Sequence, residues 1–157
     1  MPLEWNTSYE TGESRLDRQH RRLFDYANQL EGHLDRLRAG EAPALGELGV
    51  FLSFVETHLY LHLTYEELLM RRTGNPAAAQ GRAAHARLEA YGQGFRARLA
   101  AQGLTLPLLE ELHHVMHTWL LGHVVRVDVG LQTALQASPQ PAGAAASTPV
   151  PRLLRAG

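Results

Sequence analysis

His62 and Glu66 lie four residues apart, and this spacing could hold a metal ion. On a helix, residues i and i+4 sit one above the other on the same face. The imidazole and the carboxylate can therefore point at one spot and offer two metal ligands together. A hydrogen-bonded pair without a metal is the alternative interpretation of these two residues.

Four more residues of the same chemical types occur elsewhere in the chain. They are His20, His85, His123 and Asp128. Imidazole and carboxylate ligands suit iron, manganese or zinc, and a site without thiolate favours non-heme iron. Each residue also has a simpler interpretation: a lone histidine on an apolar face is more often part of the core, and Asp128 could be solvated or paired with Arg126. Burying all of them without partners would cost several kcal/mol, which favours a shared site.

A shared site requires that these residues face one another from different helices. His20 precedes Leu23 and Phe24 by three and four residues, so it lies on an apolar helical face. Asp128 follows His123 by five residues, so its side chain must reach round the helix to join that histidine. Inward-facing histidines and carboxylates on the helices of a bundle can together form a two-metal site.

The apolar residues recur every three or four positions in four segments, which predicts four helices. We expect these helices over residues 17–38, 44–72, 76–101 and 105–137. Gly40, Gly74 and Gly103 mark helix ends, while Asn75 and Thr105 are expected N-caps. Short turns between the helices imply an all-α, antiparallel up-down-up-down four-helix bundle.

Glycines inside the predicted helices weigh against this pattern. They are Gly46, Gly49, Gly81, Gly92, Gly94 and Gly122. Each costs roughly 1 kcal/mol relative to alanine in a helix interior. No strand pattern competes with the helical one, so the bundle remains the prediction.

The two ends of the chain differ from the middle. Residues 1–16, with Trp5 and Tyr9, are expected to form an ordered arm over the bundle of residues 17–137. Residues 138–157 are rich in proline and alanine and cannot bury enough apolar area to offset their entropy, so we expect a disordered tail. The tail could dock a protein partner, although a tail without such a role is the simpler interpretation.

Composition excludes several classes of protein. The 157 residues suit one domain, and 16 acidic against 15 basic residues give no sign of a nucleic-acid or membrane partner. The absence of cysteine rules out disulfides and thiolate-bound zinc or iron–sulfur sites. There is no long apolar run and no signal-peptide pattern at the N-terminus, so a cytoplasmic location is expected.

Four motifs resemble those of the hemerythrin family, particularly the bacterial single-domain hemerythrin-like proteins. The motifs are Asp17-x-Gln-His20, His62-x-x-x-Glu66-Glu67-x-x-Met70, Asn75-Pro76 and Trp119-Leu-x-x-His123-x-x-x-x-Asp128. The resemblance covers about residues 5 to 130. It implies a four-helix bundle around two iron ions, Fe2+ or Fe3+, joined by an oxo or hydroxo bridge and binding O2 reversibly.

The resemblance also assigns roles to individual residues. By resemblance, His20 and His62 hold the iron that receives O2, and His85 and His123 hold the other iron. Glu66 and Asp128 bridge the two ions. The apolar residues expected to line the O2 pocket are Leu23, Phe24, Leu63, Trp119, Leu120 and Val124.

Gly81 departs from the family pattern. The family has two histidines four residues apart on the third helix, and this chain keeps only the second, His85. The missing ligand could be replaced by water or a small exogenous ligand, by Glu89 or His58, or the second iron could be lost. Gly81 could also simply mark close packing. Two histidines per iron would leave both ions with an open position.

These residues favour an O2-binding di-iron protein, acting as carrier, store or sensor, over an enzyme. The alternative is an oxidase or peroxidase-like scavenger of peroxide or NO that uses the open position created by Gly81. A sensor would need a partner for its signal, and the tail is the expected contact. A bundle without metal would require all of these spacings to be coincidental.

Overall fold

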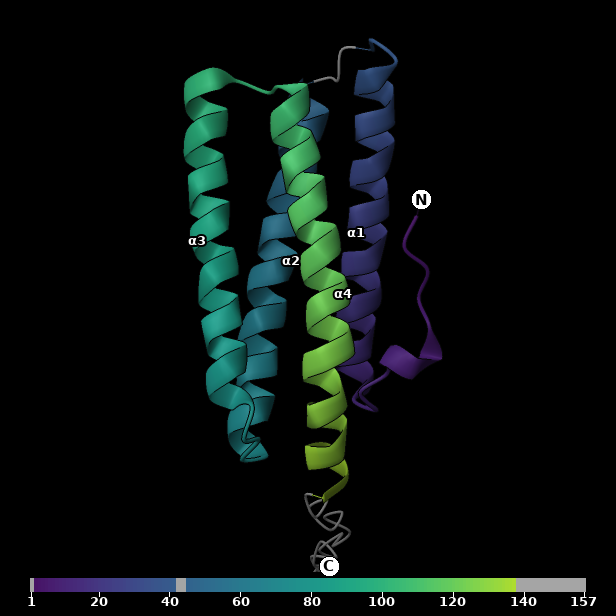
Figure 1. The fold of residues 1–157 in the computed structure, drawn as a ribbon, viewed down its shortest axis with the longest axis vertical. Helices are drawn as coiled ribbons and strands as arrows, with labels where there is room; N and C mark the ends of the chain where they lie inside the picture. Colours follow the sequence, from purple (N-terminus) through teal and green to yellow (C-terminus); the bar gives the residue numbers. More distant parts are fainter. Residues whose placement is uncertain (1, 42–44, 138–157) are drawn as a thin grey trace, which may run out of the picture.

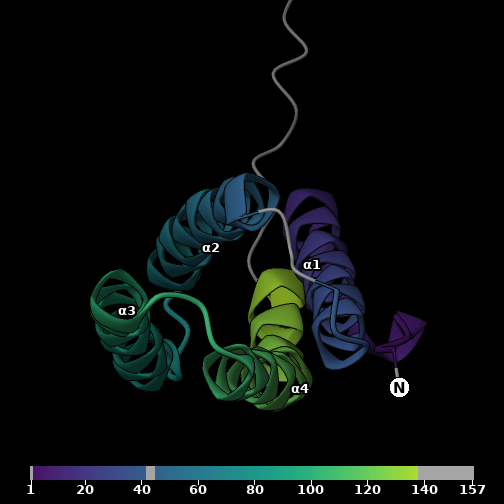
Figure 2. The ribbon, with the colours of Figure 1, turned by 90° about the horizontal axis from the view of Figure 1, so that it is seen from above.

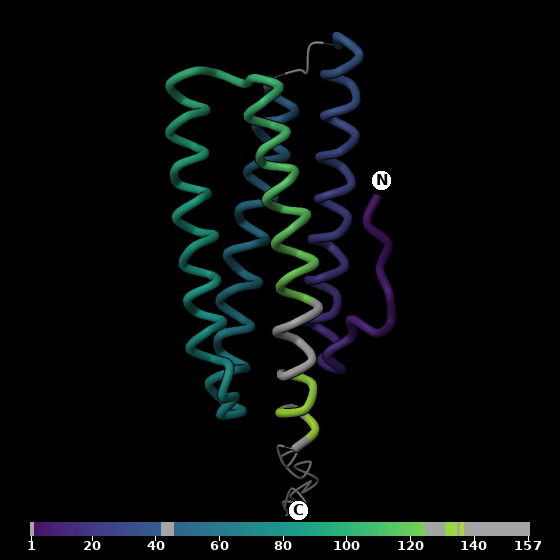
Figure 3. Tube along the Cα trace, in the orientation of Figure 1, coloured from purple at the N-terminus to yellow at the C-terminus, as the bar shows by residue number. Residues whose placement is uncertain are grey.

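Four long helices make up most of the chain. The computed structural model describes residues 2–41 and 45–137, apart from the side chains of residues 45, 125–130, 135 and 137. In this part, a short 3-10 helix η1 (Thr7–Tyr9) precedes α1 (Ser14–Arg38), α2 (Leu45–Arg72), α3 (Ala78–Gln102) and α4 (Leu106–Ala137). The long helices run alternately up and down, so the predicted all-α antiparallel bundle is confirmed (Figure 1, Figure 3).

All three predicted helix ends have a glycine with positive φ. Gly40, Gly74 and Gly103 have φ angles of 80°, 61° and 71°, which residues other than glycine rarely adopt. At Gly40 and Gly74 the following residue also closes the helix end. The next backbone N–H reaches back over the last turn: Glu41 donates to the Arg36 carbonyl and Asn75 to the Met70 carbonyl, both at 3.0 Å. This pattern satisfies carbonyls that a helix end leaves free.

The predicted N-caps have different outcomes. Thr105 caps α4 as expected, because its Oγ1 accepts from the Leu108 N–H at 3.3 Å. Asn75 does not cap α3: its Oδ1 accepts from the Ala77 N–H at 2.8 Å in a turn, and the helix begins at Ala78 rather than at 76. α1 begins three residues earlier than predicted, because the Glu13 carboxylate accepts from the Leu16 N–H at 2.6 Å.

The helices run unbroken through the interior glycines, despite their predicted cost. Packing supplies the offsetting stabilisation, because most helical stability in proteins comes from a buried apolar face. Three clusters of buried apolar residues form the core. Their members are Leu30, Leu34, Leu48, Phe51, Val55 and Leu109; Leu23, Phe24, Ala27, Leu120 and Val124; and Leu16, Leu69, Met70 and Leu131.

The four helices do not share this core equally. α1 packs closely against both α2 and α4, whereas α3 packs more sparsely against the same two helices (Figure 2). Among the described residues, α3 supplies no buried member of the three clusters. The core is therefore built mainly by α1, α2 and α4.

The N-terminal arm lies against α1 (Figure 1). Leu3 donates its N–H to Asn28 Oδ1 at 2.7 Å, and Asn28 Nδ2 donates to the Leu3 carbonyl at 3.0 Å. Thr11 donates its N–H and its hydroxyl to Asp17 Oδ1 at 2.7 and 2.8 Å. These contacts hold both ends of the arm.

The tail expected at residues 138–157 lies outside the described residues. Within the described part of the chain, no helix combines the length and the apolar character needed to cross a membrane.

Candidate metal centre

Every long helix sends at least one ligand-type side chain to a single buried cluster. The members are His20 of α1, His62 and Glu66 of α2, His85 of α3 and His123 of α4, and none is more than 4% exposed. They form two triads, His20–His62–Glu66 and Glu66–His85–His123, whose ligand atoms lie within 4.8 Å of one another. Glu66 belongs to both triads, so the cluster is continuous.

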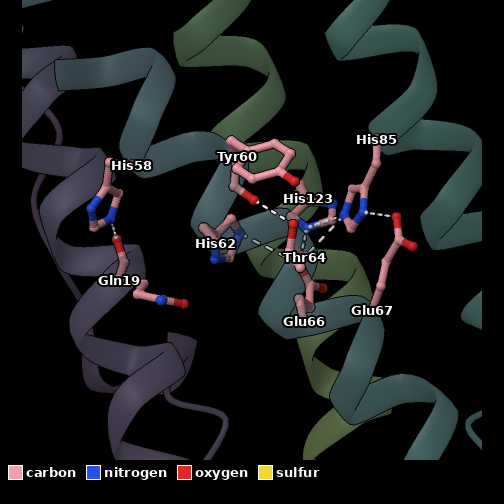
Figure 4. A network of polar contacts seen from close by, with 9 residues as sticks. All are labelled: Gln19, His58, Tyr60, His62, Thr64, Glu66, Glu67, His85 and His123. Carbon is pink, nitrogen blue, oxygen red and sulfur yellow. Dashed lines mark hydrogen bonds and ion pairs between the residues drawn. The ribbon is translucent and has the colours of Figure 1, made fainter. Parts of the chain in front are cut away.

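Glu66 is the centre of this arrangement. Its Oε2 lies 2.9 Å from His123 Nε2 and 3.4 Å from both His62 Nε2 and His85 Nε2. Figure 4 shows these side chains converging from three helices. The His20 ring packs edge-on against the His62 ring, with centroids 4.7 Å apart. Four imidazoles therefore surround one carboxylate.

Neighbouring side chains hold the histidine rings in place. His85 Nδ1 lies 3.1 Å from Glu67 Oε1, which leaves Nε2 directed at Glu66 and His123 (Figure 4). A carboxylate on the second ring nitrogen is the usual way in which proteins orient a metal-binding histidine. The Trp119 ring stacks on His123 with centroids 4.4 Å apart, and Trp5 of the arm stacks near His20 at 6.4 Å.

Local sequence explains why these polar groups lie inside the bundle. Each histidine occupies the apolar face of its helix, with buried apolar residues one turn away. Examples are Leu23 after His20, and Leu120 before His123. When the helices pack these faces together, the polar residues come with them. The i, i+4 spacing of His62 and Glu66 then places both in one layer of the core.

Burial keeps two of the imidazoles neutral. Loss of solvation lowers the pKa of His20 to about 4 and that of His62 well below its ordinary value. Neutral imidazole is the form that binds metals, because its ring nitrogen keeps a free electron pair. These two residues are therefore in the ligating state at neutral pH.

Hydrogen bonds outweigh burial at two other members of the cluster: the pKa of Glu66 is lowered and that of His85 is raised. Burial would raise the pKa of Glu66, but hydrogen bonds from His123 and His85 hold it well below the usual range. Burial would lower the pKa of His85, but hydrogen bonds to Glu66 and Glu67 outweigh it and raise that pKa. A carboxylate that stays ionised inside the bundle needs positive charge beside it.

The hydrogen bonding of the cluster is incomplete in a way that fits a cation. Among the described residues, His62 Nε2, which faces Glu66, and Glu66 Oε1 are buried without a hydrogen-bond partner. Each such atom costs about 1–3 kcal/mol when left unsatisfied. Buried imidazole nitrogens and a carboxylate oxygen are ligands for a divalent metal. The residues present therefore fit a metal ion, and the cluster could hold one.

The remaining predicted ligands lie elsewhere or outside the described residues. The side chain of Asp128 is outside the described part of the structure, so its bridging role stays a prediction. Glu89 is exposed on α3 and belongs to neither triad. His58 contacts α1 instead, with Nε2 3.1 Å from the Gln19 carbonyl oxygen, and Figure 4 shows it apart from the cluster.

Met70 fills the space beside Gly81. A Cβ atom added at Gly81 would lie 3.0 Å from Met70 Sδ and 3.1 Å from Met70 Cε. Met70 is 1% exposed and lies one turn beyond Glu66, just as Gly81 lies one turn before His85. The position at which the resemblance expects a histidine is thus closed by a thioether side chain.

The residues predicted to line an O2 pocket are all withdrawn from solvent to some degree. Leu23, Phe24, Leu63, Leu120 and Val124 are buried, and Trp119 is partly buried against them. Sequence reasoning assigned no role to Glu67, to Trp5 as a neighbour of His20, or to Met70 as the group beside Gly81. Glu67 stands next to Glu66 in the motif, and this adjacency is the signal that could have identified it.

The chain matches no model of a known protein family and none of the curated proteins compared with it. Fold and site together define a four-helix bundle with a buried His/Glu cluster that could bind metal.

Proposed function

We propose that this chain is a hemerythrin-like non-heme iron protein that binds O2 at two iron ions. The observation that carries the proposal is the pair of buried triads that share Glu66. Two adjacent triads suit two ions, and a carboxylate common to both suits a bridge. His20 and His62 would hold one ion, and His85 and His123 the other. Asp128 is the proposed second carboxylate bridge.

Iron, when bound, supplies the electrons that O2 takes up. The chain contributes the surroundings of that reaction. Neutral His20 and His62 offer nitrogen ligands without first losing a proton. Buried Leu23, Phe24 and Val124 keep water from the His20 side of the cluster, which protects a reversible complex from protonation. Binding that can be reversed suits a carrier, a store or a sensor.

One observation favours a second candidate function, the scavenging of peroxide or NO. Each triad holds two histidines, and in the second triad α3 contributes His85 alone, since Gly81 stands one turn earlier. Glu89, the carboxylate expected as a substitute on α3, is exposed and belongs to neither triad, and Met70 fills the space beside Gly81. Two incompletely liganded ions would react with a small oxidant from either side.

A metal assay followed by visible spectroscopy tests the proposal. The iron-loaded full chain should hold two irons, and the anaerobic ferrous form should develop an absorption band when O2 is added. A band that disappears on removing O2 indicates a carrier or store, while a transient band indicates the scavenger. One iron or none per chain would contradict the two-ion site.

Paired variants show whether the triads hold that iron. Glu66→Ala should lose most of it, because both triads lose their shared carboxylate. His114→Gln, at an exposed histidine outside the triads, is the matched control and should keep two irons. Equal iron content in the two variants would place the metal elsewhere.

A further inference from the structure

A cavity of about 500 Å³ opens between α2, α3 and α4. It lies on the side of the cluster nearer the α3–α4 turn, where α3 packs sparsely against its neighbours (Figure 2). Small-molecule pockets in proteins have volumes of about 300–1,000 Å³, so this cavity has the right size for one organic molecule. It is far larger than O2 requires, since even a water molecule occupies only about 30 Å³ in the liquid.

The lining is apolar, with two charged residues. Leu52, Leu88, Phe95 and Leu99 are typical of its walls. The charged residues that line it are Glu56 and Arg96, which form an ion pair with each other and are both more than half exposed. Their charges cancel and stay in contact with water. The interior therefore offers no net charge to a ligand, and burying an ionised group there would be unfavourable.

Two glycines on facing helices enlarge the cavity. Gly49 of α2 and Gly92 of α3 both line it, and a Cβ atom added at either would meet nothing within 4 Å. Most other residues would stabilise these two helices better than glycine does. Glycine instead leaves the space beside the backbone open. Gly92 is partly buried, whereas Gly49 lies at the exposed rim of the cavity, and a larger side chain at either would meet no neighbour before it extends over the lining.

The inner end of the cavity reaches the metal cluster. Four of its lining residues lie three positions from a cluster histidine on the same helix: Leu23, Leu59, Leu88 and Leu120. Trp119 also lines the cavity and stacks on His123 at 4.4 Å. A molecule in the cavity would therefore lie about one helical turn from the two triads.

We propose that this cavity binds a neutral, apolar organic molecule beside the metal cluster. A helix is about 10–12 Å across with its side chains, so the cavity has room for only about one turn of it and suits a compact small molecule better. Its lining selects against a charged ligand, and its glycines provide the room. The binding does not require metal, so it can fail or succeed independently of the proposed O2 function.

Titration with N-phenyl-1-naphthylamine, a neutral fluorophore that brightens in apolar surroundings, tests the proposal on the full chain. Wild-type protein should bind one probe per chain, both with and without iron. Gly92→Leu places a side chain in the cavity and should weaken binding about tenfold or more. Gly94→Leu is the matched control, because Gly94 is exposed on the same helix and does not line the cavity.

A second pair covers the opposite wall and guards against a variant that fails to fold. Gly49→Leu should weaken binding as Gly92→Leu does, whereas Gly46→Leu, at an exposed glycine outside the lining, should not. Circular dichroism of all four variants reports whether the helices are intact. No binding to the wild type, or equal binding by folded cavity and control variants, would overturn the proposal.

Competition identifies the chemical class of the ligand. 1-Dodecanol should displace the probe from the wild type at a lower concentration than dodecanoate, because most of the lining is apolar and its cation, Arg96, is already paired with Glu56. If dodecanoate displaces the probe more readily, the proposed preference for a neutral ligand is wrong.

Discussion

α1 and α3 are both 25 residues long and occupy opposite positions in the bundle, yet they contribute different things to it (Figure 2). α1 buries eight residues, most of them apolar, and joins all three core clusters. α3 buries four, of which His85 belongs to the candidate metal cluster and Gly81 lies one turn before it. The comparison shows a division between α1, which supplies much of the apolar core, and α3, which leaves room beside the candidate site.

Truncating one leucine on each helix should show this division most strongly. Leu30 of α1 is fully buried in the largest cluster, whereas Leu88 of α3 lines the cavity. Leu30→Ala should lower the free energy of unfolding by about 4 kcal/mol, and Leu88→Ala by about 2 kcal/mol, because the second side chain has fewer neighbours to lose. Urea unfolding of the metal-free protein measures both, and equal losses would contradict the division.

Lowering the pH should change the stabilising contributions of His20 on α1 and His85 on α3 in opposite directions. The pKa of His20 is about 4 when folded and 6.5 in its unperturbed state, so its contribution is complete above pH 6.5 and is lost as the pH falls to 4. This loss amounts to about 3 kcal/mol in the metal-free protein. Unfolding measured at pH 7 and pH 4 should therefore show a smaller difference in His20→Gln than in the wild type.

His85 provides the contrast, because its pKa is raised. Its stabilising contribution is present below pH 6.5 and is lost as the pH rises through the folded value. Protonated His85 stabilises the fold at low pH, so His85→Gln should lose more unfolding free energy between pH 7 and pH 4 than the wild type does. If both variants change the pH dependence in the same direction, the two histidines do not have the opposite environments described above.

A histidine at position 81 should destabilise the contact between α2 and α3. Gly81→His places a ring where Met70 lies and should cost about 2 kcal/mol through overpacking. Met70→Ala should cost at least as much by leaving a cavity. The loss of unfolding free energy in the double variant should be smaller than the sum of the two single losses by at least about 1 kcal/mol. A double-mutant cycle measures this difference. Additive costs would show that the two positions are independent.

The smallest expected effect is a difference in unfolding free energy between alanine substitutions at two glycines of α3. Gly92→Ala adds a methyl group in open space and should raise the free energy of unfolding by about 1 kcal/mol through helix propensity. Gly81→Ala should gain less, because its methyl group meets Met70 at 3.0 Å. Thermal unfolding compares them, and an equal gain would mean that Met70 moves aside freely.

The fold could be predicted from local patterns. The spacing of Leu23, Ala27, Leu30 and Leu34 marks one helical face, and Gly40 ends that helix by a conformation that few other residues adopt. The helix starts were less predictable, because a cap depends on which side chain reaches a free N–H. Glu13 does so at α1, whereas Asn75 bonds within the turn before α3.

The candidate site was predictable where a residue lay on an apolar face. His20, His62, Glu66, His85 and His123 follow this rule, and the structure brings them together. His58 is one turn from His62, yet it faces Gln19, because the rotation of α2 against α1 decides its direction. The cavity and the position of Met70 depend on the spacing of several helices, which no single segment encodes.

The packing of Met70 against Gly81 also bears on how this sequence can change over generations. If Gly81 is replaced first by a larger residue, that residue overpacks against Met70. If Met70 is replaced first by a smaller residue, a cavity is left beside Gly81. Changing both together avoids the two defects. We therefore expect the two positions to change together, although they lie 11 positions apart in the sequence. We expect a sequence with this glycine and this methionine to reach a histidine at position 81 only through a less stable variant.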